Sequence, residues 1–255
     1  MKTIIANWKM NVGVRESVAL ARTTLLALRG RKLIPELIVC PPFVALSEVR
    51  KAVARSSVSL GAQDVFWKDS GAFTGEISGR MLSELEVSHV IIGHSERRFV
   101  FGETDEMIRL KTVHALESGL VPIVCVGETK EQKDGGDAVE IVKTQVKTIF
   151  DGVRARTRGK LYIAYEPVWA IGTGNVCSVE DTIKMHAAIR ESAAKFFEQD
   201  RVAVIYGGSV DEKNAYGLLR EKQIEGLLVG GASVKINQFK EIIASACEVM
   251  EAQEG

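Results

Sequence analysis

The chain alternates short apolar runs with amphipathic segments along its whole length, and this alternation most constrains its fold. Each run has four to six residues and is rich in β-branched side chains, which is typical of buried strands. Eight runs occur, at Thr3–Ala6, Leu37–Cys40, Val58–Gly61, His89–Ile92, Val121–Val126, Leu161–Tyr165, Val202–Tyr206 and Gly226–Val229. Such alternation predicts parallel strands joined by right-handed crossovers.

The segments between the runs carry apolar residues at helical spacing, with charges on the other faces. The spacing is clearest at Val14–Leu28, Thr104–Leu116, Ala138–Phe150, Ser178–Phe197 and Ile236–Met250. The length of 255 residues suits one closed α/β barrel, and no linker or low-complexity stretch divides the chain. We therefore expect residues 1–255 to form a single (β/α)8 barrel domain, with eight parallel strands surrounded by helices.

Charge and cysteine content argue against several classes of protein. The 33 basic and 33 acidic residues cancel, and the short basic runs lack clustered aromatic residues, so we expect no nucleic-acid partner. The four cysteines and four histidines form no close metal-ligand pattern, so we expect no metal and reduced thiols. We see no export signal and no long apolar run, and predict a cytoplasmic protein without a membrane partner.

Ionisable, amide and hydroxyl side chains follow the first, fourth and sixth runs, where a barrel of this kind builds its active site. They are Asn7, Lys9, His94, Ser95, Glu96 and Glu166. Proton abstraction beside a carbonyl needs a base near carbon and donors near oxygen, and Glu166, His94 and Lys9 supply that set. Taken singly, each has an ordinary alternative as a solvated glutamate, a core histidine or a surface lysine.

Glycine-rich turns follow the seventh and eighth runs, at Gly207-Gly208-Ser209 and Gly230-Gly231. Backbone N–H groups in such turns bind phosphate, and this fold often places that site after strands seven and eight. We expect phosphate binding by Ser209, Gly230 and Gly231. The alternative is that the glycines only permit tight turns.

The segment Val168–Gly174 is too apolar for a solvated turn and has the character of a lid that would add the Gly172 N–H to the phosphate site. A buried connection with Trp169 in the core is the alternative. The segment lacks the third glycine of a dinucleotide fingerprint, so we expect no nucleotide.

Five segments, spread over essentially the whole chain, resemble the signature segments of the triosephosphate isomerase family. They are Asn7–Asn11, Gly93–Arg98, Tyr165–Gly174, Tyr206–Val210 and Leu228–Ser233. The resemblance implies a TIM barrel that interconverts dihydroxyacetone phosphate and D-glyceraldehyde 3-phosphate through an enediolate. This is a cofactor-free aldose–ketose isomerisation of glycolysis and gluconeogenesis.

The roles of individual residues also follow from the resemblance, because this family is itself the standard worked case of a glutamate base beside a neutral histidine. Glu166 matches the base, His94 the electrophile, Lys9 the cation that attracts the dianionic substrate, and Asn7 a contact to the reacting oxygens. Supporting residues are Ser95 and Glu96 at the start of a helix, Tyr206 and Ser209 against the closed lid, Leu228 against the base, and Glu128 with Trp169 at the lid.

The loop Gly71–Glu76 matches one that enters a neighbouring subunit in the family, so we expect a homodimer. Phe73 folded back on its own barrel is the alternative. We also expect a Glu76–Arg97 ion pair to hold the loop.

The chain departs from the family's usual pattern at two places. Asp64 stands where asparagine is usual and adds a charge near the expected interface, and the lid's far hinge is Asn175-Val176-Cys177. Cys40 and Cys125 match strand-end positions and are expected to be packing residues.

Two other functions remain open. A Schiff-base aldolase of the same fold would need a lysine on an inner strand, typically the sixth. A non-catalytic barrel would keep the glycine turns and lose the base or the electrophile.

Overall fold

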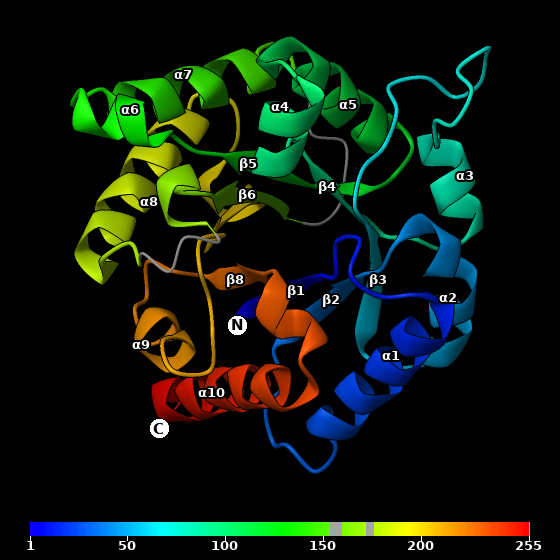
Figure 1. Ribbon diagram of the computed structural model, residues 1–255. Helices are drawn as coiled ribbons and strands as arrows, with labels where there is room; N and C mark the ends of the chain where they lie inside the picture. Colours follow the sequence, from blue (N-terminus) through cyan, green and yellow to red (C-terminus); the bar gives the residue numbers. More distant parts are fainter. Residues whose placement is uncertain (154–159, 172–175, 255) are drawn as a thin grey trace.

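The computed structural model describes residues 1–153, 160–171 and 176–254, and its strands form a closed parallel barrel (Figure 1). The strands follow one another in sequence order around the barrel, and β1 pairs with β8 to close it. Their bounds are β1 (Thr3–Asn7), β2 (Glu36–Cys40), β3 (Val58–Ala62), β4 (His89–Ile92), β5 (Val121–Val126), β6 (Leu161–Tyr165), β7 (Val202–Tyr206) and β8 (Gly226–Val229). The predicted eight-stranded barrel is confirmed.

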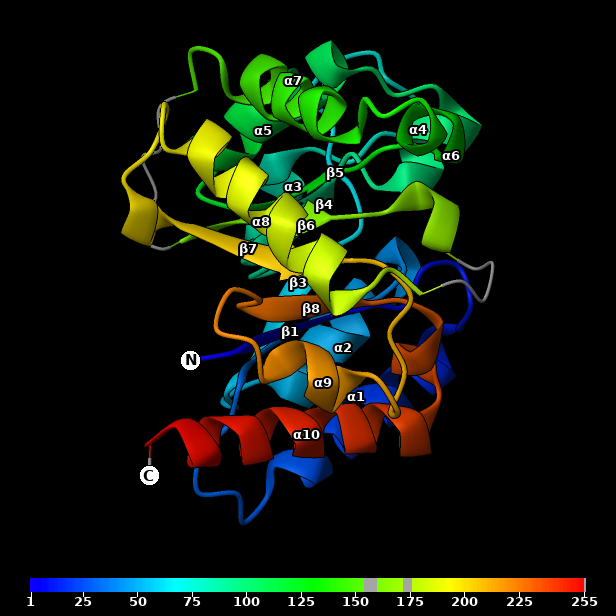
Figure 2. The ribbon, with the colours of Figure 1, turned by 90° about the vertical axis from the view of Figure 1, so that its left-hand side faces the viewer.

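Helices cover the outside of the barrel, and the C-terminal helix packs beside the first (Figure 2). The α-helices of the described ranges are α1 (Val14–Leu28), α2 (Leu46–Val53), α3 (Gly79–Glu84), α4 (Ser95–Phe101), α5 (Asp105–Glu117), α6 (Lys130–Asp134), α7 (Ala138–Phe150), α8 (Val179–Ala193), α9 (Ala215–Leu219) and α10 (Ile236–Glu254). Short 3-10 turns lie at η1 (Phe43–Ala45), η2 (Val168–Ala170), η3 (Gln199–Arg201) and η4 (Gly231–Val234).

The core has two layers because successive strand side chains point to opposite faces. Ile4 and Ala6 belong to the layer between strands and helices, whereas Ile5 lies among the residues that fill the barrel. Cys40 and Cys125 are fully buried in this inner layer, and burial raises the pKa of both thiols. They are packing residues, as predicted.

One predicted helix is shorter than expected, and several helices were not predicted separately. The segment Ser178–Phe197 contains α8, which ends at Ala193, and the chain then turns. Helices α2, α3, α6 and α9 have five to eight residues, too few for helical periodicity to be visible in sequence.

The loop Gly71–Glu76 projects from the body of the molecule, between β3 and α3 (Figure 1). The Phe73 ring lies 4.6 Å from that of Phe66 and is 38% exposed. The expected Glu76–Arg97 ion pair does not form among the described residues, so this prediction is wrong. Arg97 pairs with Asp64 and Glu103 instead.

Candidate active site

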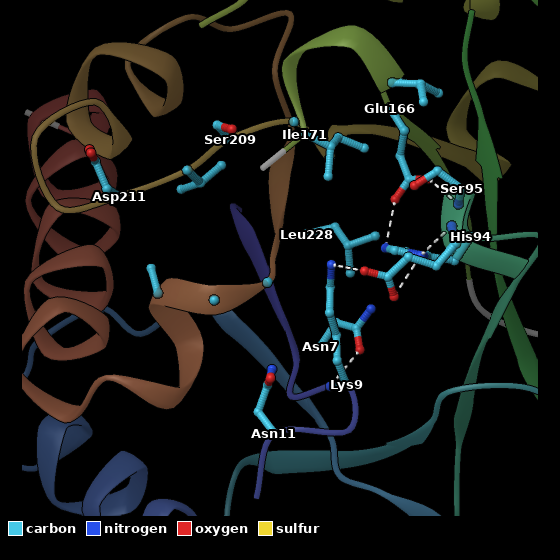
Figure 3. Close-up of a pocket in the computed structure, with 18 of the residues that line it drawn as sticks. Asn7, Lys9, Asn11, His94, Ser95, Glu166, Ile171, Ser209, Asp211 and Leu228 are labelled. Atoms are coloured by element: carbon cyan, nitrogen blue, oxygen red, sulfur yellow. Dashed lines mark hydrogen bonds and ion pairs between the residues drawn. The ribbon is translucent and has the colours of Figure 1, made fainter. Parts of the chain in front are cut away.

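A pocket of about 840 Å³ opens at the carboxyl ends of the strands (Figure 3). The predicted site residues that line it are Asn7, Lys9, His94, Ser95, Glu96, Glu166, Ser209, Leu228, Gly230 and Gly231. Tyr206 is fully buried and lies outside the lining of this pocket, and Gly172 lies outside the described residues. The barrel thus brings together residues from five of its strand ends.

Glu166 follows β6 directly and is almost fully buried, with 2% of its surface exposed. Its N–H donates to the Val126 carbonyl at 2.8 Å, which fixes the backbone at the end of the sheet. Its Oε2 accepts the Ser95 N–H at 2.7 Å, and its Oε1 has no hydrogen-bond partner although it lies 3.1 Å from His94 Nε2. One carboxylate oxygen is therefore buried beside the His94 ring without a hydrogen bond.

His94 caps the N-terminus of α4, and this fixes its tautomer. The Glu96 N–H donates to Nδ1 at 3.2 Å, so Nδ1 keeps its lone pair and the ring proton of a neutral imidazole sits on Nε2. That Nε2 faces the Glu166 carboxylate in Figure 3. The ring is thus oriented to donate to an oxygen in the space beside Glu166.

Lys9 has a left-handed backbone with φ of 52°, which is uncommon for a residue other than glycine. Two side chains stabilise this conformation. Asn7 Oδ1 accepts the Lys9 N–H at 3.1 Å, and Gln63 Nε2 donates to the Lys9 carbonyl at 2.9 Å. Lys9 Nζ lies 2.6 Å from Glu96 Oε1. The role of Gln63 was not predicted from the sequence, although its place just after the third strand was a signal.

Both glycine turns line the pocket. Figure 3 places Ser209 across the pocket from His94, whereas Gly207 of the same turn lies against Glu166, since a Cβ there would be 3.0 Å from Glu166 Cγ. A Cβ on Gly230 would lie 3.3 Å from Lys9 Cε, so the lysine stem passes over this glycine. Gly231 begins the 3-10 turn η4, whose first N–H groups have no partner within the turn. The arrangement joins an ammonium group to exposed backbone donors, which suits a phosphate dianion.

Side-chain hydrogen bonds help to tie the segment after Glu166 to its surroundings. Ser209 Oγ donates to the Ala170 carbonyl at 2.6 Å, and Trp169 Nε1 donates to Glu128 Oε1 at 2.7 Å. Tyr165 also donates to Glu128 Oε1, at 3.0 Å, and burial raises the pKa of the Glu128 carboxyl. The expected Glu128–Trp169 contact is present. The glycines of the predicted lid lie outside the described residues.

The described residues offer neither a metal-binding cluster nor a membrane-spanning helix. No three of their histidine, cysteine and acidic side chains gather closely enough to hold a metal ion. None of their helices is both long and apolar enough to cross a bilayer.

Comparison with known proteins identifies the family. The family model described as triosephosphate isomerase matches residues 2–246. A triosephosphate isomerase of Thermoanaerobacter pseudethanolicus is 43% identical over 94% of this chain and 97% of its own length. Those of Citrifermentans bemidjiense and Aquifex aeolicus are 44% and 42% identical, over 95% and 96% of this chain and 98% and 99% of their own lengths.

The chain belongs to the triosephosphate isomerase family.

Membership of the triosephosphate isomerase family weakens both other functions. Strand β6 reads Leu-Tyr-Ile-Ala-Tyr and contains no lysine, so the Schiff-base aldolase lacks its nucleophile there. A non-catalytic barrel of the family would have lost the base or the electrophile, but both line the pocket.

Proposed function

We propose that the chain interconverts dihydroxyacetone phosphate and D-glyceraldehyde 3-phosphate, with Glu166 as the base and His94 as the electrophile. One observation supports these roles most strongly. A buried carboxylate with an unpartnered oxygen lies 3.1 Å from the Nε2 of a histidine whose Nδ1 accepts a backbone N–H, inside a pocket lined by glycine turns. The reaction is an isomerisation between an aldose and a ketose phosphate, a step of glycolysis.

Substrate binding begins with the phosphate on the glycine side, at Gly230, Gly231 and Ser209. This places the carbonyl end of a three-carbon chain between Lys9 and His94. Lys9 then exchanges its contact with the half-exposed Glu96 for the substrate, and its positive charge stabilises the negative oxygen that develops. Asn7 holds the backbone of Lys9 in place.

The chemical step transfers one proton in each direction. Glu166 releases the Ser95 N–H, takes the proton from the carbon beside the carbonyl, and becomes a neutral acid. The C–H electron pair forms the enediolate double bond, while His94 Nε2–H donates to the carbonyl oxygen. His94 passes a proton from the hydroxyl oxygen to the former carbonyl oxygen, and return of the proton from Glu166 to the former carbonyl carbon gives the other triose phosphate and regenerates the carboxylate.

The lid proposed from sequence, with the Gly172 N–H on the phosphate, would serve the same chemistry. An enediolate phosphate can eliminate its phosphate, and exclusion of water suppresses this side reaction. Tyr206 and Leu228 are proposed to support the closed segment and the base. The Glu128–Trp169 hydrogen bond supports a fixed start for that segment.

We further propose that residues 1–255 act as one catalytic domain in a cytoplasmic homodimer. The projecting loop Gly71–Glu76 supports the dimer, as do large apolar side chains left uncovered in the single chain. These include Met10 at 95%, Val44 at 76% and Phe101 at 66% exposed. A second copy of this chain is the partner that would cover them.

Analytical ultracentrifugation of Thr74→Arg tests the dimer. A long charged side chain at the loop tip should shift the protein to a monomer, whereas Gln253→Arg on the distant helix α10 should leave the dimer intact. A monomeric wild type, or a Thr74→Arg protein that remains dimeric, would contradict the proposal.

A coupled assay tests the reaction. D-glyceraldehyde 3-phosphate is supplied, and glycerol-3-phosphate dehydrogenase reports the ketose formed as loss of NADH absorbance. We expect turnover without added metal or cofactor, and no covalent adduct when borohydride is added with substrate. A folded protein without turnover would support the non-catalytic barrel, and an adduct would support the aldolase.

A further inference from the structure

Four charged side chains form a closed, alternating arrangement outside the pocket lining, which we call the ion-pair cluster: Asp64, Arg97, Glu103 and Lys111. Lys111 Nζ donates to both oxygens of Asp64, at 2.7 and 2.9 Å, and also to Glu103. Arg97 lies 2.9 Å from Asp64 Oδ2 and 2.5 Å from Glu103 Oε1. Each carboxylate therefore contacts both cations, and the formal charges cancel.

The ion-pair cluster is almost entirely buried. The side chains of Lys111 and Glu103 are each 2% exposed and that of Asp64 is 7% exposed, while Arg97 is the most accessible member at 31%. Burial raises the pKa of the Asp64 carboxyl, with Lys111 and Arg97 acting in the opposite direction. Buried charges in such a network hold one another in a single geometry, because a displaced member leaves its partners unpaired in a medium of low dielectric constant.

Arg97 connects the ion-pair cluster to the candidate active site. The backbone N–H of Arg97 donates to the His94 carbonyl at 2.8 Å, and this hydrogen bond closes the first turn of α4. His94 caps this turn, and the Ser95 N–H within it donates to Glu166. A shift of Arg97 along the helix would therefore move both the electrophile and the group that holds the base.

Asp64 also stands beside a second support of the site. The preceding residue, Gln63, donates to the carbonyls of Lys9 and Cys40, at 2.9 and 3.0 Å. The two residues after β3 thus hold the start of α4 on one side and the strained Lys9 on the other. Lys111 and Arg97, the ion-pair partners of the Asp64 carboxylate, do not line the pocket, so the influence of Asp64 on the site passes through Arg97 and the backbone of α4.

We propose that Asp64 is a positioning residue for the isomerase reaction, which holds Arg97 and, through it, the first turn of α4, where His94 and Ser95 meet Glu166. This inference rests on the proposed function. It gives the Asp64 charge a role within one chain. Our expectation that this charge also lies near the subunit interface stays a prediction.

Asp64→Asn is the first test, because it removes the charge and keeps the shape. We expect kcat to fall about 10- to 100-fold, the range that a misplacement approaching 1 Å can produce. KM should stay within about threefold, because the glycine turns are outside the ion-pair cluster. Glu36→Gln is the control, since Glu36 is a paired carboxylate at the other end of the barrel. A Glu36→Gln protein with the same fall in kcat would overturn the proposal.

Ligand binding separates misplacement from general loosening. The probes are inorganic phosphate and 2-phosphoglycolate, whose carboxylate has the charge and shape of the enediolate. In Asp64→Asn the Kd of phosphate should be unchanged, whereas that of 2-phosphoglycolate should rise by about the factor lost in kcat. An equal loss for both probes would show a merely structural role.

A double-mutant cycle with Arg97→Met tests whether Asp64 acts on the first turn of α4 through Arg97. If Asp64 acts through Arg97, the double variant should lose no more kcat than the worse single variant, whereas additive losses would refute it. If Asp64→Asn does not fold, the double variant Asp64→Asn/Lys111→Met is used instead. It keeps the cluster neutral and still removes the carboxylate that pairs with Arg97. Normal kcat in this folded variant would also refute the proposal. Wild-type turnover separately tests the proposed function, so the two failures are distinguishable.

Discussion

Gly127 lies directly against Glu166, so close that a Cβ built on Gly127 would overlap the Glu166 carbonyl. The glycine follows β5, and Glu166 follows the neighbouring strand β6. The base is therefore placed by backbone contact as well as by hydrogen bonds. A side chain at position 127 cannot fit unless one of the two strand ends moves.

We predict that Gly127→Ala displaces Glu166 and lowers kcat by about 100-fold, the typical effect of a 1 Å shift. It should also lower the free energy of unfolding by about 1–3 kcal/mol, the usual cost of overpacking. Gly217→Ala is the control, because nothing lies within 4 Å of a Cβ at that position. Equal kcat values for the two variants in the coupled assay would show that the contact does not position the base.

His94→Gln should lower kcat by about 10²- to 10⁴-fold, the usual contribution of a positioned proton donor. The amide keeps hydrogen-bonding capacity but cannot exchange a proton as imidazole does. KM should change little, because the phosphate side is untouched. His114→Gln, a change of the same type outside the pocket lining, should retain wild-type kcat. Steady-state kinetics that give both variants similar values would reject His94 as the electrophile.

Lys9→Met should lower activity chiefly because it removes the positive charge that attracts the phosphate dianion. We expect kcat/KM to fall by at least about 100-fold, and its dependence on ionic strength to flatten relative to wild type. Lys51→Met, on the exposed face of α2, should keep the wild-type salt dependence. A Lys9→Met profile that remains as steep as wild type would place the steering charge elsewhere.

His89 and His186 should make the protein less stable in mild acid. Burial lowers the pKa of each to about 4, and the unfolded value is near 6.5. The unfolded chain therefore binds protons first, so stability is full above pH 6.5 and falls as the pH drops towards 4. The loss is on the order of 3 kcal/mol per histidine over this window.

Urea unfolding at fixed protein concentration between pH 7 and 5 would measure this loss. His186→Phe should flatten the profile, because the ring is fully buried and would no longer gain a proton on unfolding. A wild-type profile that is level over this range would contradict the prediction.

Much of the barrel could be predicted because the periodicity of apolar residues is detectable in the sequence where the strands and helices are long. The predicted bounds of α1 and α7, Val14–Leu28 and Ala138–Phe150, match the structure. Helix α9 has only five residues, so no repeat was visible. The candidate catalytic residues were predictable for a different reason, since each follows a strand end and the barrel gathers those ends at one mouth.

The ion-pair cluster could not be predicted. Lys111 stands in a helical segment where a charge is normally solvated, and Asp64 follows a strand 47 residues earlier. Only the closed barrel brings these two side chains together and buries them. The expected Glu76–Arg97 pair failed for the same reason, because the cluster already occupies Arg97.

The most direct test of the account is turnover of D-glyceraldehyde 3-phosphate by wild type and Glu166→Asp, with Glu131→Asp on the exposed helix α6 as control. Shortening the base by one methylene withdraws its carboxylate by about 1 Å, which should lower kcat about 100-fold. We predict fast turnover by wild type and Glu131→Asp and this large loss in Glu166→Asp. Unchanged turnover in Glu166→Asp would contradict the assignment of Glu166 as the base.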